Sequence, residues 1–381
     1  MKRIFALMLT VLLLCSAAAC TKREAEAEQP EATAAPTPAA TPKPAAEPTQ
    51  APAPEETPEP TPEATPEPVK EEEPPYRDMF NGAARTEPNT ERPFAVMINN
   101  IKEAQPQCGI SDADIIYEVL AEGGVTRMMA IFSDVRKAEH LGSVRSIRPY
   151  YIDISLAYGA VTCHAGGSDD AYRRLKNDGV ENIDGVNGKL PMTVYYRDQA
   201  RRSAGYAVEH TLFTEGENLY NCAEKMNYDL TLPEGYDNGL RFVADGTPEN
   251  GKAANTIKMK FIAWKTTTLN YHEDTGLYTA QQHGGSYADG NTKEELTFRN
   301  VVAIWAPTKA VDDYGRLQID VIGGGKGSFA CGGKSVDITW KRDSVEDCFH
   351  YYLADGSELQ LGEGTTYIAV LSNDRSEIVM E

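Results

Sequence analysis

Apolar residues are grouped into short runs over most of this chain, and the spacing of the runs changes along its length. Between residues 93 and 226, runs typical of strands alternate with stretches of helical periodicity. Beyond residue 251 the helical periodicity is lost, and turns such as Asp274-Thr275-Gly276 separate successive short runs. The pattern predicts an α/β N-terminal domain over residues 76–245, followed by a mainly antiparallel β C-terminal domain over residues 246–381.

The expected elements follow from these runs. A Gly123-Gly124 pair between two apolar runs predicts a β-hairpin with a two-residue loop. In the N-terminal domain we expect strands at 93–100, 114–120, 126–132, 160–164 and 192–196, and helices at 149–158, 168–176 and 215–226. In the C-terminal domain we expect strands at 257–264, 268–272, 277–280, 298–305, 316–322, 335–341, 351–353 and 366–371.

The first twenty residues have the pattern of a lipoprotein signal peptide. Met1-Lys2-Arg3 is basic, Ile4 to Leu14 is apolar but too short to span a bilayer, and Ala17-Ala18-Ala19 precedes Cys20. We therefore expect a signal peptide over residues 1–19 and a diacylated Cys20 that holds the chain on the outer face of the bacterial cytoplasmic membrane. A plain signal peptide cut before Cys20 is the alternative.

Residues 20–75 are rich in Pro, Glu, Ala and Thr and have almost no large apolar side chain. Such a segment cannot bury enough surface to offset its loss of conformational entropy, so we expect a disordered tether. The formal net charge of the whole chain is −20. This acidic balance argues against nucleic acid and anionic lipid surfaces as partners.

The cysteines and histidines predict no metal site, and no cofactor is expected. No cysteine pair has Cys-x-x-Cys spacing, and His272, His283 and His350 lack the spacing of a metalloprotease. Most cysteines of the folded part are interpreted as small buried residues, with one disulfide open: Cys108, Cys163, Cys222, Cys331 and Cys348. The glycine-rich segment 323–328 lacks the spacing of a phosphate-binding loop and is expected to form a flexible turn.

Arg145 and Arg148 form the most informative pair of charges. Pro149 favours the first turn of a helix, which places both arginines at or before a helix N-terminus, where a cation is disfavoured and an anion is stabilised. One interpretation is an anion-binding site for a phosphate or carboxylate of the cell wall. The other is a structural ion pair with Glu118, Glu122 or Asp153.

The hairpin brings further charged residues together. A two-residue loop at Gly123-Gly124 would pair Glu118 with Met129 and place Glu118 diagonal to Arg127, within side-chain reach. Structural pairing of Glu118 with Arg127 is one interpretation. The other is that Glu118 and Glu122 act as paired carboxylates in acid–base chemistry on a glycan.

His164 ends an expected strand and precedes the glycine-rich turn 165–167, a position where α/β folds place ligand-contacting groups. His164 is thus a candidate for catalysis or binding, or alternatively a hydrogen-bonded histidine of the core. Ser168 is a candidate binding residue, but it is also a suitable N-cap for the following helix. The Gly-x-Ser-x-Gly pattern of a serine nucleophile is absent around it.

Several long motifs occur in order at 92–100, 113–118, 122–127, 142–148, 164–168, 333–341 and 355–359. Together they resemble the YerB-type lipoprotein family, a domain of unknown function. The resemblance covers nearly all of residues 90–372 and implies a membrane-attached envelope protein with two domains, without an established reaction. The chain departs from the family pattern at Val208-Glu209-His210-Thr211, where a Pro-His-Asn-like segment is expected.

The sequence is compatible with two functions. The first is a non-catalytic, lipid-anchored module that binds an anionic cell-wall component or an envelope protein, with Arg145, Arg148, Arg127, His164 and Ser168 as candidate binding residues. The second is an enzyme that acts on a wall glycan or peptide through His164 and the Glu118 and Glu122 carboxylates. The convergence of these residues in one cleft would favour the enzyme.

Overall fold

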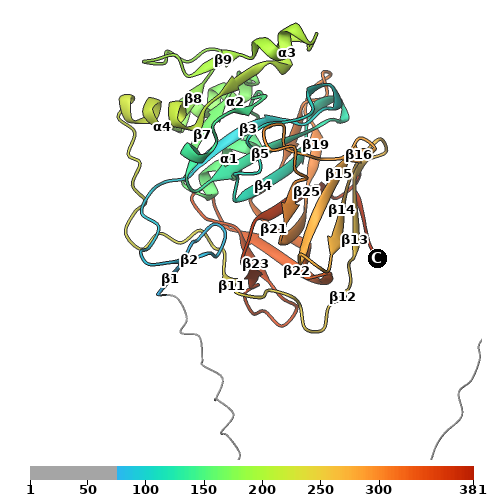
Figure 1. Cartoon of the computed structure of the whole chain (residues 1–381). Coiled ribbons are helices and arrows are strands. Elements are labelled where there is room, and N and C mark those ends of the chain that lie inside the picture. The colour runs from blue at the N-terminus through green and yellow to red at the C-terminus, as the bar shows by residue number, and fades with distance from the viewer. Residues whose placement is uncertain (1–74) are drawn as a thin grey trace, which may run out of the picture. The chain divides into compact units, whose positions relative to one another are not determined.

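The computed structural model describes residues 75–381, so the expected signal peptide, Cys20 and almost all of the tether lie outside the described residues. The described part belongs to one compact unit that is mostly β-sheet with few helices (Figure 1). Among the described helices, none has both the length and the apolar character needed to cross a membrane.

An eleven-stranded mixed sheet is the main element of the structure. Its order is β12-β22-β21-β18-β25-β4-β5-β3-β7-β8, with β23 paired to β22. Strand β4 pairs in parallel with β25, so the change of pattern near residue 245 does not interrupt this sheet. The strands are β3 (Phe94–Asn99), β4 (Ile115–Leu120), β5 (Thr126–Phe132), β7 (Val161–His164), β8 (Asn182–Asp184), β12 (Lys252–Ala253), β18 (Asn300–Ala306), β21 (Gly323–Cys331), β22 (Lys334–Arg342), β23 (His350–Tyr352) and β25 (Thr366–Ser372).

A second, six-stranded sheet is antiparallel throughout, in agreement with the expectation for the C-terminal region. Its strands are β13 (Thr256–Ile262), β14 (Lys265–His272), β15 (Leu277–Gln282), β16 (Gly285–Ser286), β17 (Thr297–Phe298) and β26 (Glu377–Met380). Smaller sheets join β1 (Tyr76–Arg77) to β2 (Ala84–Arg85), β6 (Leu141–Gly142) to β10 (Leu212–Thr214) and β9 (Tyr195–Arg197), β11 (Phe242–Val243) to β24 (Leu361–Gly362), and β19 (Thr308–Ala310) to β20 (Leu317–Ile319).

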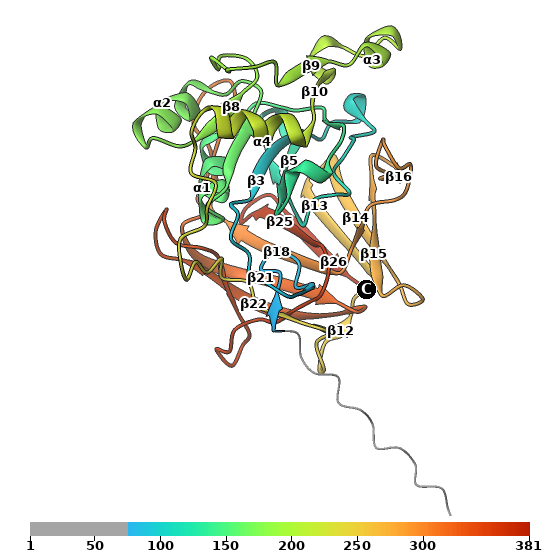
Figure 2. The ribbon, with the colours of Figure 1, turned by 60° about the vertical axis from the view of Figure 1, so that its left-hand side comes forward.

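Four α-helices are present in the described residues: α1 (Pro149–Ala157), α2 (Asp169–Asn177), α3 (Gln199–Ser203) and α4 (Gly216–Lys225). Three of them match the helices expected from sequence, and Pro149 occupies the first turn of α1 as predicted. Helices α2 and α4 lie near the β7–β8 edge of the main sheet, and α3 lies at the top of the molecule beside β9 and β10 (Figure 2). The α/β character is therefore limited to this region.

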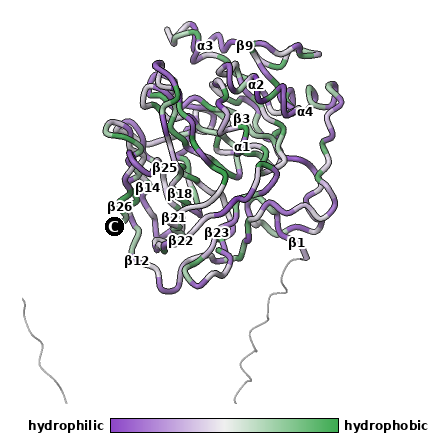
Figure 3. Tube along the Cα trace, turned by 180° about the vertical axis from the view of Figure 1, so that it is seen from behind, coloured by the Kyte–Doolittle hydropathy of each residue, from purple (hydrophilic) through white to green (hydrophobic). Residues whose placement is uncertain are grey.

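The core is formed by strands that are buried along their whole length. β3, β4, β5, β18 and β25 contain no exposed residue. Continuous apolar runs of this kind are typical of strands covered on both faces. Figure 3 shows the apolar residues concentrated along the inner strands, with hydrophilic residues in the outer loops and helices.

The predicted hairpin exists, but its register differs from the expectation by one residue. Leu120 pairs with Thr126, and Glu118 with Met128, because the connection is a longer turn that includes the 3-10 segment Glu122–Gly124. Val119, and not Leu120, lies opposite Arg127. Since neighbouring residues of a strand point to opposite faces, Glu118 and Arg127 do not share a face, and the predicted pairing between them is wrong.

The glycine-rich segment 323–328 is not a flexible turn, as expected from sequence, but the first part of β21. Close packing explains its glycines. A Cβ atom at Gly325 would lie 2.8 Å from the Trp305 carbonyl oxygen and 2.8 Å from Trp340 Nε1, and one at Gly327 would lie 2.9 Å from the Ala303 carbonyl oxygen. The glycines let β21 pass close to two tryptophans, and composition alone does not distinguish this role from a turn.

Candidate anion-binding site

The segment from Val144 to Ile147 places Arg145 at the carboxyl ends of two parallel strands. The Arg145 amide donates to the Met97 carbonyl at the end of β3 (2.9 Å), and the Ala165 amide after β7 donates to the Arg145 carbonyl (3.0 Å). The backbone of Arg145 is thus fixed between these two strands. The carboxyl ends of parallel strands are where α/β folds hold their ligands.

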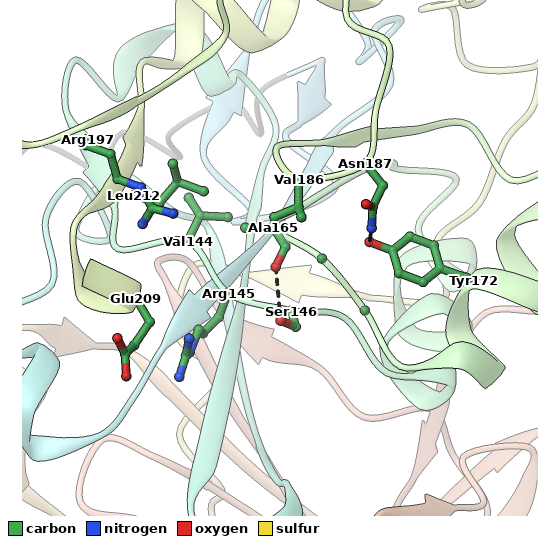
Figure 4. Close-up of a pocket in the computed structure, with 12 residues that line it drawn as sticks. Val144, Arg145, Ser146, Ala165, Tyr172, Val186, Asn187, Arg197, Glu209 and Leu212 are labelled. Atoms are coloured by element: carbon green, nitrogen blue, oxygen red, sulfur yellow. Dashed lines mark hydrogen bonds between the residues drawn. The ribbon is translucent and has the colours of Figure 1, made fainter. Parts of the chain in front are cut away.

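A pocket of about 320 Å³ opens at this place (Figure 4). This volume lies at the lower end of the range of small-ligand sites. Its lining is mixed in polarity and comes from the 144–146 segment, the turn after β7, α2, the loop after β8, β9, and the region 209–212. The lining residues are Val144, Arg145, Ser146, Ala165, Gly166, Gly167, Tyr172, Val186, Asn187, Arg197, Glu209 and Leu212.

The Arg145 side chain is half-buried and has no hydrogen bond or ion pair to any other residue within 75–381. Burial lowers the pKa of its guanidinium, and the positive charge of Arg127 lowers this pKa further. The attraction of Glu209 acts in the opposite direction. Arg145 therefore presents a charged group with five N–H donors to the pocket, without the carboxylate partner that a structural arginine usually has.

Arg148, unlike Arg145, forms a structural ion pair. Its Nε lies 3.0 Å from Glu122 Oε2, its Nη2 also contacts Glu122, and Arg127 Nη2 lies 3.0 Å from Glu122 Oε1. Burial would raise the pKa of Glu122, but the Arg148 hydrogen bond and the charges of the two arginines outweigh it and lower that pKa to about 2. Glu122 thus pairs with both Arg127 and Arg148, whereas Arg145 has no carboxylate partner among the described residues.

Arg197 and Glu209 provide the other charges that line the pocket. Arg197 lies on β9 and donates from Nη1 to the Val208 carbonyl (2.5 Å). Glu209 is exposed, and Figure 4 shows it on the same side as Arg145 with no bond drawn between them. Two arginines and one exposed carboxylate give the pocket a net positive charge, in contrast to the acidic chain as a whole.

The glycine-rich turn after β7 is held by Asp184 at the end of β8. The Asp184 carboxylate accepts from the amides of Gly166 (2.8 Å), Val186 (2.9 Å) and Asn187 (3.1 Å), and from the Tyr172 hydroxyl (2.8 Å). Burial would raise the pKa of Asp184, but the Gly166 amide and the charge of His164 outweigh it, and the pKa is lowered. One buried carboxylate therefore shapes one wall of the pocket.

His164 and Ser168 lie beside the pocket but do not line it. His164 is fully buried, its Nδ1 lies 2.9 Å from the Gly166 carbonyl oxygen, and its Nε2 lies 3.2 Å from Asn182 Oδ1. Burial lowers the pKa of His164. Ser168 is the N-cap of α2 and accepts from the Ala171 amide at 3.3 Å. His164 therefore has the contacts of a hydrogen-bonded core histidine, and Ser168 has those of a helix N-cap.

Glu118 is remote from the pocket. Its fully buried carboxylate lies between the two large sheets, where Oε1 is 2.8 Å from Lys265 Nζ. Burial would raise the pKa of Glu118, but the charge of Lys265 outweighs it, and the pKa is lowered. Further bonds reach the carboxylate from Asn100, Thr126, Thr267, Gln282 and Tyr367. Glu118 and Glu122 therefore do not form a carboxylate pair.

The pocket residues do not include a metal-binding set. Among residues 75–381, one group of three close ligand atoms occurs, at Asp347, Cys348 and His350, on a different part of the fold. The five cysteines of the folded part have free thiols, so the disulfide left open by the sequence does not form among them.

Sequence reasoning missed several residues of the pocket. Arg197, Tyr172 and Asn187 come from a strand, a helix and a loop that meet only in the folded chain. Asp184 ends β8, a strand of three residues with a single apolar side chain, which is too short to give a strand signal in the sequence.

The comparisons with known proteins agree with this fold. Residues 80–229 match the family described as "Protein of unknown function (DUF3048) N-terminal domain", and residues 257–368 match its C-terminal domain. The Bacillus subtilis (strain 168) protein named "Putative lipoprotein YerB" is 28% identical over 284 residues, which are 74% of this chain and 81% of that protein. The crystal structure of the YerB protein from Bacillus subtilis superimposes with a TM-score of 0.69 and 26% identity, covering 80% of this chain and 99% of that one.

Proposed function

Because the chain belongs to the DUF3048 family and resembles a protein named as a lipoprotein, we propose that it is an envelope protein anchored through a lipid on Cys20. We further propose that it is a non-catalytic module whose pocket at Arg145 binds a phosphate-bearing component of the cell wall. The tether over residues 20–75 would hold the binding domain away from the membrane.

The observation that carries this proposal is the unpaired Arg145 guanidinium in the pocket. A half-buried cation without a partner is costly unless an anion from outside completes its hydrogen bonds. Arg197 adds a second guanidinium, and a phosphate accepts bidentate hydrogen bonds from arginine. The Asn187 amide adds neutral N–H donors in the same pocket, whereas the Ser146 hydroxyl donates to the Ala165 carbonyl at 3.0 Å. Together these groups suit a compact anion with several acceptor oxygens.

The alternative of a wall-acting enzyme has less support. His164 has both ring nitrogens engaged below the surface, and the Glu118 and Glu122 carboxylates are each paired with a cation in different places. No pair of acid and base groups named from the sequence meets in the pocket. The binding module is therefore the function that the geometry supports better.

The proposal can be tested with residues 70–381, which form one compact unit. The soluble fragment is incubated with purified cell walls before and after removal of their phosphate polymers, and the bound fraction and the masses of released products are measured. We expect retention that requires the phosphate polymers, falls about tenfold or more in Arg145→Gln, and produces no new masses.

Arg316→Gln is a matched control, because it removes one arginine from a surface pair with Asp312 outside the pocket. Its retention should equal that of the wild type. Retention that is equal for stripped and unstripped walls, or equal in Arg145→Gln, would refute phosphate binding at this pocket. New product masses would support the enzyme instead.

A further inference from the structure

Three potential metal ligands lie together on the loop that enters β23, far from Arg145 in the fold. Asp347 and Cys348 precede this strand and His350 begins it, where β23 pairs with β22. In Figure 1, β23 lies at the lower end of the molecule, whereas β7, β8 and β9 lie at the top. The cluster is thus independent of the pocket described above.

The spacing of the three ligand atoms is close to that around a tetrahedral ion. His350 Nε2 lies 3.4 Å from Cys348 Sγ and 3.4 Å from Asp347 Oδ1, and Sγ lies 3.9 Å from Oδ1. Zinc bonds of about 2.0–2.3 Å at tetrahedral angles separate such ligand atoms by about 3.3–3.6 Å. Only the separation of Sγ from Oδ1 has to shorten, by a few tenths of an ångström.

The loop already holds these groups in position. Asp347 Oδ2 accepts from the Asp343 amide at 2.9 Å, which orients the carboxylate. The buried Arg342 donates to the carbonyls of Asp347 (2.8 Å) and Val345 (2.7 Å). A ligand set fixed by outer contacts loses little conformational entropy when an ion binds. His350 Nδ1 is buried and has no hydrogen-bond partner among the described residues. Because burial keeps Nδ1 from an ion in solution, Nε2 is the ring nitrogen available as a ligand.

The chemistry of the set favours a borderline divalent metal. A thiolate, an imidazole and a carboxylate together suit Zn²⁺ better than Mg²⁺ or Ca²⁺, which prefer oxygen ligands. Cys348 is the partly exposed cysteine of the described residues, whereas Cys108, Cys163, Cys222 and Cys331 are buried. An ion from solution can therefore reach Cys348.

We propose that Asp347 Oδ1, Cys348 Sγ and His350 Nε2 form a Zn²⁺ site with the fourth position open to water or an external ligand. A cysteine binds a metal ion as the thiolate. Binding therefore replaces the thiol proton by the metal. One S–H bond breaks, one metal–sulfur bond forms, and one proton is released to solvent for each ion bound.

The test is a titration of residues 70–381 with Co²⁺, a spectroscopic substitute for Zn²⁺, in a reducing agent that does not chelate metals. We expect one equivalent of Co²⁺ to produce a thiolate-to-cobalt charge-transfer band, release about one proton, and be displaced by Zn²⁺. Cys348→Ser should abolish the band. His350→Gln and Asp347→Asn should weaken binding by about 10- to 100-fold or more.

His272→Gln is the matched control, because His272 is an exposed histidine that contacts Thr279 on the six-stranded sheet. It should bind Co²⁺ like the wild type. Far-ultraviolet circular dichroism and thermal melting show whether each variant is folded, and Asp347→Asn keeps the shape of the side chain if Cys348→Ser does not fold. The absence of the band in the wild type, or an unchanged affinity in both His350→Gln and Asp347→Asn, would overturn the site.

Discussion

Glu118→Gln is expected to lower the free energy of unfolding by about 3–5 kcal/mol, because it leaves the buried Lys265 ammonium without its counter-ion. The Glu118 side chain is 0% exposed and the Lys265 side chain 4% exposed, so water cannot replace the lost carboxylate. The pair also joins β4 of the main sheet to β14 of the six-stranded sheet. Urea denaturation of residues 70–381 measures the effect.

A double-mutant cycle with Lys265→Met shows whether the loss comes from the ion pair. The double variant should lose less than the sum of the two single variants, because the second substitution removes the charge that the first leaves unpaired. Glu294→Gln, at an exposed position, is the matched control and should stay within about 0.5 kcal/mol of the wild type. Additive losses would contradict the pairing.

The same pair predicts a dependence on pH. The pKa of Glu118 is lowered from its ordinary value of 4.5, so its contribution to stability is present above that value and is lost as the pH falls through the folded pKa. The difference in stability between wild type and Glu118→Gln should therefore shrink in acid, below about pH 4.5.

Asp184→Ala is expected to have the second large effect, on both stability and anion binding. It removes the acceptor of three backbone amides and of the Tyr172 hydroxyl, and bonds of this kind to a charged group contribute about 1.5–3 kcal/mol each before the structure relaxes. We expect a net loss of about 2–4 kcal/mol in urea denaturation. Affinity for phosphate should also fall about tenfold, because the turn with Gly166 lines the pocket.

Asp184→Asn separates the charge of Asp184 from its shape. An amide retains one acceptor oxygen, so this variant should lie between wild type and Asp184→Ala in both measurements. The lowered pKa of Asp184 means that its contribution is present above its ordinary value of 3.8 and disappears in stronger acid. If Asp184→Ala unfolds like the wild type and binds phosphate equally well, the carboxylate does not organise the pocket.

The sequence predicts the local elements of this fold better than their assembly. Helix α1 was predictable because Pro149 marks its first turn, and β3 and β25 because their apolar runs are continuous. The parallel pairing of β4 with β25 was not predictable, because it joins residues about 250 positions apart and no local signal records it. For a similar reason the glycines of β21 were misread, since the tryptophans that require them lie on other strands.

The candidate site was predicted in part. Arg145 and Arg148 were singled out because they precede an expected helix, and the turn after His164 because it follows an expected strand. Glu122 pairs with Arg148 and not with Arg145. This difference depends on side-chain geometry, which the sequence pattern does not record. The predicted pairing of Glu118 with Arg127 was wrong because the hairpin register differs by one residue from the expected one. A shift of one residue moves a side chain to the other face of a sheet.

Isothermal titration of pyrophosphate into residues 70–381 tests the central claim most directly, because it measures anion binding at the pocket without a wall polymer. We predict one bound anion per chain, an affinity about 10- to 100-fold weaker in Arg145→Gln, and an unchanged affinity in Arg316→Gln. An affinity that is the same in wild type and Arg145→Gln, or no binding at millimolar pyrophosphate, would contradict the assignment of Arg145 as an anion-binding residue.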